Sequence, residues 1–147
     1  MRKILILCLA LISFSSYSQQ KFATKSGKPL FEGYDPVSYF SGTPTPGNIQ
    51  HFYLLDEQMI YFSSESNREK FANNPSKYLP AYGGWCSISM AEDHFVIPDY
   101  TMYKIQDNQL HFFSVRAFFN GLTAWEKDPI GNKIKATANY TKHFQAN

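Results

Sequence analysis

The sequence predicts a small α+β domain, because two hairpin patterns alternate along the chain with segments of helical character. The first hairpin pattern spans residues 51–63, where two runs rich in Tyr, Phe, Leu and Ile flank the polar residues 56–58. The second spans residues 100–114, with a tight turn at Asp107-Asn108. Two hairpins separated by helical segments are typical of an α+β domain.

Helical signals lie between and after these hairpins. Ser66 and Glu69 have the spacing of a capping box, which predicts a short helix that ends before Pro75. Residues 117–127 and 130–143 carry apolar residues at helical spacing, so we expect two helices at the end of the domain. The positions expected to face the core are Phe118, Leu122, Trp125, Ile130, Ile134 and Ala138. The pattern indicates no internal repeat.

The first 18 residues have the features of a secretory signal peptide. Arg2 and Lys3 precede an apolar stretch of about eleven residues, which is too short to span a bilayer comfortably. Ser16 and Ser18 fit the small-residue positions of a cleavage site before Gln19. We therefore expect a periplasmic or secreted protein with no stable membrane insertion after cleavage. The expected segments are a signal peptide over residues 1–18, a flexible leader over residues 19–29 and a folded domain over residues 30–144.

Composition excludes several classes of function. Without Arg2 and Lys3, the 14 basic residues fall to 12, equal to the 12 acidic residues, so the exported chain lacks the basic excess of a nucleic-acid-binding protein. The sequence carries no Gly-x-Ser-x-Gly and no His-Glu-x-x-His motif. The 13 Phe, 10 Tyr and 2 Trp residues predict a well-packed aromatic core.

An ordered set of short motifs covers most of the expected domain. The set comprises Gly33-Tyr34-Asp35-Pro36-Val37, Ile60-Tyr61-Phe62-Ser63-Ser64, Asn74-Pro75-Ser76-Lys77-Tyr78-Leu79 and Pro80-Ala81-Tyr82-Gly83-Gly84-Trp85-Cys86. In this order the motifs resemble the YHS-domain family, in its exported bacterial branch. The resemblance implies a small metal-binding module related to cysteine-rich metal-sensing domains. Where many members carry further cysteines, this chain has Ser38, Ser63 and Asn67, which leaves Cys86 as the retained thiol.

Cys86 is the central candidate, because it is the only cysteine outside the predicted signal peptide. The resemblance implies redox or soft-metal chemistry at this position, since some relatives carry selenocysteine there. A helix that starts after Gly83-Gly84 would place the thiol near free N–H groups, which favour a thiolate. Cys86, Met90 and His94 are spaced i, i+4, i+8, and their sulfur and imidazole donors suit copper(I). His51 and His111 are further candidates to approach the thiol from the strands.

Three functions follow from these observations. The first, which the sequence favours, is a binding module that holds a soft transition-metal ion such as copper and delivers it to a periplasmic metal-handling partner. The second is a one-cysteine thiol oxidoreductase or peroxidase with Cys86 as catalytic residue and a redox partner, although no second cysteine could resolve its intermediate. The third is a structural or protein-interaction domain in which Cys86 is a buried, inert core residue.

Overall fold

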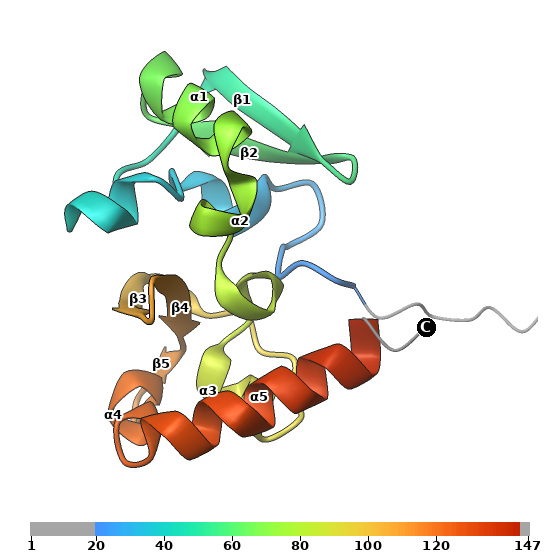
Figure 1. The fold of residues 1–147 in the computed structure, drawn as a ribbon, viewed down its shortest axis with the longest axis vertical. Helices are drawn as coiled ribbons and strands as arrows, with labels where there is room; N and C mark the ends of the chain where they lie inside the picture. Colours follow the sequence, from blue (N-terminus) through green and yellow to red (C-terminus); the bar gives the residue numbers. More distant parts are fainter. Residues whose placement is uncertain (1–19, 145–147) are drawn as a thin grey trace, which may run out of the picture.

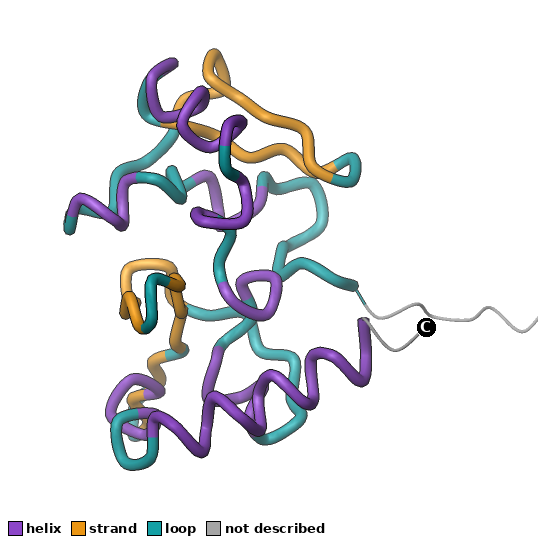
Figure 2. Tube along the Cα trace, viewed as in Figure 1, coloured by secondary structure: helices purple, strands orange, loops and turns teal. Residues whose placement is uncertain are grey.

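The computed structural model describes residues 20–144, so the predicted signal peptide over residues 1–18 lies outside the described part of the chain. The described residues form helices and three antiparallel two-stranded sheets, which confirms the α+β class (Figures 1 and 2). None of these helices is both long and apolar enough to cross a membrane. In chain order the elements are η1 (Leu30–Gly33), η2 (Ser38–Ser41), β1 (Asn48–Leu55), β2 (Gln58–Phe62), α1 (Glu65–Asn73), α2 (Pro75–Tyr78), η3 (Ala81–Gly84), α3 (Ser87–Ala91), β3 (Asp99–Gln106), β4 (Gln109–Phe113), β5 (Val115–Arg116), β6 (Phe119–Asn120), α4 (Gly121–Trp125) and α5 (Pro129–Phe144), where η denotes a 3₁₀ helix.

Both predicted hairpins are present. β1 pairs with β2 and β3 pairs with β4, each through a two-residue loop. The loop residues are all left-handed, with φ of 46° at Asp56, 64° at Glu57, 50° at Asp107 and 63° at Asn108. Left-handed φ at both loop positions is the geometry of a type I′ turn, whose twist matches that of the paired strands.

Helix α1 begins two residues earlier than the capping pattern predicts. Its N-cap is Ser64, whose hydroxyl accepts a hydrogen bond from the amide of Asn67 at 3.2 Å. Glu65 then occupies the first turn, where a carboxylate interacts favourably with the positive end of the helix dipole. The predicted end is confirmed, because Pro75 starts α2 directly after Asn74.

The prediction of a single helix over residues 117–127 is wrong. The chain instead forms the short β5–β6 hairpin, and α4 begins only at Gly121, where the Asn120 side chain accepts from the amide of Thr123 at 3.1 Å. Gly121 donates to the carbonyl of Ser114 at 2.9 Å, and a Cβ at this glycine would lie 2.9 Å from that oxygen. This close approach requires the chain to fold back, and the fold-back leaves Phe118 fully exposed in the hairpin loop.

Helix α5 buries a different face from the predicted one. Ile130 and Ile134 are exposed, whereas Ala136 and Tyr140 are buried. α5 packs against α3, and Asn139 donates a hydrogen bond to the carbonyl of Met90 at 2.9 Å. The small Ala136 side chain permits this close helix contact. The contact with α3, and not the apolar pattern of the sequence, therefore determines which face of α5 is buried.

The segment predicted as a flexible leader over residues 19–29 is held against the domain at Phe22 and Ala23. Both residues are buried, and the amide of Ala23 donates to the carbonyl of Gly83 at 2.9 Å. The hydroxyl of Tyr100 donates in turn to the carbonyl of Ala23 at 2.9 Å. These backbone contacts explain why a polar segment is ordered here.

The structure contains an internal repeat that the sequence pattern does not indicate. Residues 29–63, the first unit, and residues 80–114, the second unit, have the same backbone plan with an offset of 51 residues. The β1–β2 partners Phe52–Tyr61 correspond to Tyr103–Phe112 in β3–β4, and the irregularity in register falls at the same place in both hairpins. The units diverge after Ser63 and Ser114, where α1 follows one and the β5–β6 hairpin follows the other.

The unusual backbone conformations repeat with the same offset. The matching residues with positive φ are Phe31 and Tyr82, Glu32 and Gly83, Gly33 and Gly84, Gly42 and Asp93, Asp56 and Asp107, and Glu57 and Asn108. The backbone hydrogen bond from Asp35 to Thr45, at 2.9 Å, has its counterpart from Cys86 to Val96, at 3.0 Å. Left-handed residues are uncommon outside glycine, so their coincidence identifies the two units as equivalent.

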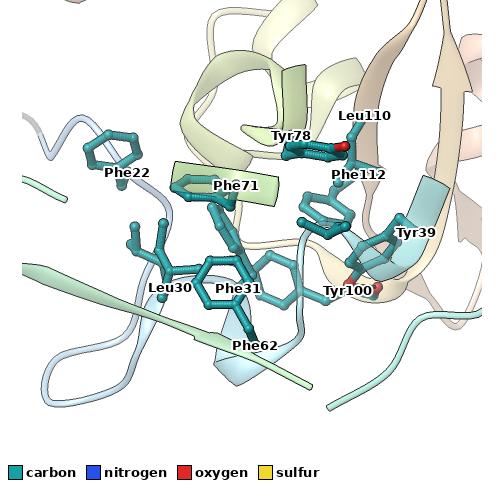
Figure 3. Packing of buried hydrophobic residues seen from close by; sticks show 12 residues of the cluster. Phe22, Leu30, Phe31, Tyr39, Phe62, Phe71, Tyr78, Tyr100, Leu110 and Phe112 are labelled. Carbon is teal, nitrogen blue, oxygen red and sulfur yellow. Dashed lines mark hydrogen bonds between the residues drawn. The ribbon is translucent and has the colours of Figure 1, made fainter. Parts of the chain in front are cut away.

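The β3–β4 hairpin lies between the two hydrophobic clusters of the domain. One face contributes Leu110 and Phe112 to a cluster with the first unit, which is drawn in Figure 3. The other face contributes Phe113 to a cluster with α3 and Trp125 of α4. In Figure 1 the first unit accordingly lies above β3 and β4, and α3, α4 and α5 lie below them.

Candidate functional site

Cys86 is completely buried and lies directly before α3. Its exposed fraction is 0%, and it belongs to the cluster that also contains Trp85, Phe113 and Trp125. Its carbonyl accepts a hydrogen bond from the amide of Met90 at 2.9 Å. The backbone of Cys86 is therefore fixed, and its side chain faces the interior of the second unit.

Among the described residues, the sulfur of Cys86 hydrogen-bonds only with Ser114, at the end of β4. The Ser114 amide donates a hydrogen bond to Sγ at 3.2 Å, and the Ser114 hydroxyl lies 3.3 Å from Sγ. These two contacts connect the start of α3 to the end of the β3–β4 hairpin. We call this pair the second clamp.

The first unit has the same arrangement, the first clamp, at Asp35 and Ser63. The carboxylate of Asp35, also completely buried, accepts from the Ser63 amide at 2.9 Å and from the Ser63 hydroxyl at 2.6 Å. It also accepts from the Asn67 side chain at 2.7 Å and from the Val37 amide at 2.8 Å, a local turn contact typical of aspartate. In both clamps the partners lie 28 residues apart.

The second clamp has no counterpart of Asn67. The residue 51 positions after Asn67 is Phe118, which points into solvent. A shallow hollow of about 230 Å³ lies above this clamp, lined by residues that include Ser89, Val96, Ser114 and Phe119. Ser114 lines this hollow, whereas Cys86 is completely buried.

The three predicted metal ligands lie directly before α3, within it and beyond its end. Cys86 and Met90 are both completely buried, one helical turn apart. α3 ends at Ala91, and His94 lies beyond it with an exposed side chain. Within residues 20–144, no group of three or more His, Cys, Asp or Glu side chains is placed to hold a metal ion. The predicted copper site stays a prediction.

The strand histidines form other contacts. His51 Nδ1 lies 3.2 Å from a carboxylate oxygen of Glu65, on the first unit. His111 is completely buried, and its Nδ1 lies 3.0 Å from the hydroxyl of Ser87. Neither imidazole makes a hydrogen bond to the Cys86 sulfur, which interacts with Ser114.

The Ser87–His111 pair is a feature that the sequence analysis did not find. Its imidazole packs between Tyr82 and Trp125, with ring centroids 5.7 and 5.2 Å away, and Nε2 has no hydrogen-bond partner in the described part of the chain. Burial, and to a lesser degree the charge of Lys133, lowers the pKa of His111 to about 4. The imidazole is therefore neutral at neutral pH.

The repeat is the signal that could have drawn attention to these residues. Ser114 matches Ser63 in the first unit, so the clamp partner of Cys86 follows from the 51-residue offset. Ser87 and His111 match Pro36 and Ile60, so a polar pair replaces two apolar residues. This replacement distinguishes the interior of the second unit from that of the first.

Comparison with protein-family models, with curated proteins and with solved structures finds no match for this chain. Its resemblance to the YHS-domain family therefore rests on the sequence motifs.

Proposed function

We propose that the chain is an exported, YHS-like binding module that works through its surface, and that Cys86 is a structural residue. The observation that carries this proposal is the equivalence of the two clamps. Asp35 and Cys86 occupy the same position in their units, are equally buried, and receive the same two contacts from a serine at the end of a hairpin. The Asp35 carboxylate and the Cys86 thiol differ in chemistry but share this position. The role that they have in common is therefore structural: each holds the end of a hairpin in place.

The burial of the Cys86 thiol favours a structural role for this residue over a role in metal delivery. A cargo ion must reach its ligands and leave them, and Cys86 has no exposed surface. The side chain of His94, the nearest predicted nitrogen ligand in the sequence, is exposed, whereas the sulfur is buried. Met90 lies in the same hydrophobic cluster as Cys86, and buried methionines readily fill protein cores.

A redox thiol is the second candidate, because the hollow lined by Ser114 lies directly over the clamp. The equivalent position holds the carboxylate of Asp35, so the clamp geometry accepts a negative charge. In this function a Cys86 thiolate would attack a peroxide oxygen, forming a sulfenic acid and releasing hydroxide. A partner thiol would then condense with the sulfenic acid, releasing water and forming a mixed disulfide, and a second partner thiol would reduce this disulfide and regenerate the Cys86 thiol.

The test compares the mature protein with Cys86→Ala, Ser114→Ala and the double variant. We expect Cys86→Ala to lower the free energy of unfolding by about 1–3 kcal/mol, because the Ser114 amide loses its acceptor and the Ser114 hydroxyl loses its hydrogen-bond partner. We expect the double variant to lose less than the sum of the single variants, since the pair is removed together. Urea unfolding followed by circular dichroism measures both effects.

Thiol reactivity separates the alternatives. As a clamp, Cys86 should react with iodoacetamide only at the rate of unfolding, and titration with copper(I) should leave the melting temperature unchanged. Fast labelling of the native protein, with no loss of stability in Cys86→Ala, would instead establish the redox function. One tightly bound equivalent of copper(I) that raises the melting temperature of the wild type but not of Cys86→Ala would establish the metal-binding module.

A further inference from the structure

The hollow over the second clamp, which we call the clamp hollow, combines polar and apolar side chains. Its lining residues are Ser89, Glu92, Val96, Ser114, Arg116 and Phe119. Small-molecule sites typically place a few polar groups among apolar side chains in this way. The volume of about 230 Å³ corresponds to about eight water-sized groups, at about 30 Å³ for each water molecule. A ligand of this hollow is therefore small.

The repeat shows which hydrogen-bonding groups are unused at this hollow. In the first unit, the Thr45 amide donates to the Ser38 hydroxyl at 2.9 Å, and this hydroxyl donates to the Asp35 carbonyl at 2.6 Å. The residues that match Thr45 and Ser38 are Val96 and Ser89. Within residues 20–144, neither the Val96 amide nor the Ser89 hydroxyl forms a hydrogen bond, although Ser89 is only 8% exposed. Nearly buried polar groups are normally hydrogen-bonded, so a ligand in the hollow would supply the partner that these two groups lack.

The type of helix explains this difference between the units. The Asp35 carbonyl accepts from the Ser38 amide at 3.1 Å, as in a 3₁₀ turn. The Cys86 carbonyl instead accepts from the Met90 amide at 2.9 Å, as in an α-helical turn. The wider α-helical turn changes the position of Ser89 relative to this carbonyl, and its hydroxyl makes no bond there. Ser89 lines the clamp hollow instead.

Arg116 and Glu92 bring one charge of each sign to the clamp hollow. Both are exposed, and among the described residues neither belongs to an ion pair, with the other or with a third side chain. An arginine fork matches the two oxygens of a carboxylate, and a glutamate accepts hydrogen bonds from an ammonium group. The hollow therefore offers complementary charges to a ligand that carries both signs.

We infer that the clamp hollow binds a free α-amino acid with a small apolar side chain, in its zwitterionic form. In this complex the ligand carboxylate accepts hydrogen bonds from Arg116, the Ser89 hydroxyl and the Val96 amide. The ligand ammonium group donates to Glu92, and the apolar side chain contacts Phe119, which is 39% exposed. Valine is of a size that the hollow accepts. This inference rests on the proposed binding function and names its site and its class of ligand.

Titration of the mature protein with L-valine, followed by the amide signals in NMR spectra, tests the site. We expect a saturable shift of the Val96 amide signal in the wild type. In Arg116→Gln the dissociation constant should rise about ten-fold or more, because charge-assisted hydrogen bonds to the carboxylate are lost. Ser89→Ala should also weaken binding. The matched control is Arg68→Gln, which should bind valine as tightly as the wild type, since Arg68 lies on α1 and pairs with Glu65.

Two analogues of valine test the two charges separately. Isovalerate keeps the carboxylate and the apolar group but lacks the ammonium group, whereas isobutylamine lacks the carboxylate. Each should bind about ten-fold more weakly than valine, or weaker still, because one charged contact is missing.

Four outcomes would overturn the inference: no saturable shift of the Val96 amide, equal affinity of Arg116→Gln and the wild type, an equal loss in Arg68→Gln, or an analogue that binds as tightly as valine. Circular dichroism and urea unfolding show whether each variant folds. Because none of the substituted residues belongs to a clamp, the clamp experiments give their answer independently. Absence of valine binding together with an inert Cys86 would reject the amino-acid site alone.

Discussion

His111 carries a buried imidazole whose protonation is opposed by the surrounding protein. Its pKa is lowered from an ordinary value of 6.5 to about 4, first by burial and then by the charge of Lys133. The unfolded chain therefore takes up a proton near pH 6.5, whereas the folded chain takes it up near pH 4. Between these values, protonation favours the unfolded state.

We expect the free energy of unfolding to fall by about 3 kcal/mol as the pH decreases from 6.5 to 4, through this residue alone. The measurement is urea unfolding across this pH range, for the wild type and for His111→Ile. Ile60 occupies the equivalent position, so isoleucine is compatible with the backbone of the hairpin. An equally steep decrease in His111→Ile would assign the pH dependence to other groups.

The sequence could identify Cys86 as a residue of interest but could not identify its surroundings. Its uniqueness is visible in the sequence, and the predicted spacing to Met90 is that of one helical turn. Its contact with Ser114 depends on how β4 ends against α3, 28 residues further along the chain. The exposure of His94 depends on α3 ending at Ala91, and no capping residue in the sequence indicates that end.

At the scale of elements, the two hairpin turns differ in how well their residues suit a left-handed backbone. Glu57 has φ of 64° and Asn108 has φ of 63° at equivalent positions. Asparagine tolerates this conformation, whereas glutamate is strained in it. The first turn therefore stores more backbone strain than the second.

We expect Glu57→Gly to raise the free energy of unfolding by about 0.5–1 kcal/mol, because glycine relieves the left-handed strain. Asn108→Gly is the matched control and should produce a smaller gain. Urea midpoints of the two variants, measured side by side, test the difference. An equal or larger gain in Asn108→Gly would show that strain at Glu57 is not the cause.

The same scale shows which elements a sequence can predict. Strands with alternating burial and polar turns were predicted correctly, because their pattern is local. The prediction of a helix over residues 117–127 was wrong, because the close contact of Gly121 with Ser114 depends on the tertiary structure and not on the local pattern. The face of α5 was wrong for the same reason: its contact with α3 decided the orientation, and Ile130 and Ile134 remained outside.

At the scale of the whole molecule, the two units share one core and should unfold together. Tyr39 belongs to the first unit, yet it packs against Tyr103 and Phe112 of the second. Both tryptophans, Trp85 and Trp125, lie in the cluster of the second unit. Tryptophan fluorescence therefore reports unfolding far from Tyr39 in the sequence.

We expect Tyr39→Ala to lower the free energy of unfolding by about 3–5 kcal/mol, through the cavity that it creates. Fluorescence and circular dichroism should show the same urea midpoint, shifted equally, because the units are coupled through this side chain. A shift seen by circular dichroism but not by fluorescence would mean that the second unit folds independently of the first.

The repeat could not be predicted from the sequence, because the two units share backbone conformation and strand register more than identical residues. The identical pairs between the units are Pro29 and Pro80, Gly33 and Gly84, Ser38 and Ser89, Asp56 and Asp107, Gln58 and Gln109, Phe62 and Phe113, and Ser63 and Ser114. Most of them occur singly, within segments whose neighbours have changed. Equivalent side chains such as Asp35 and Cys86 have different chemistry, which conceals their common position.

The two ends of the domain are not alike, and this asymmetry determines how the architecture could grow. Helix α5 closes the end beyond α3, whereas the β1–β2 face leaves the other end open. A copy of residues 29–79 placed before Pro29 would set its own Tyr39 against Tyr61, as the existing Tyr39 lies against Phe112. Elongation by whole units is thus possible in one direction only, from the amino-terminal side.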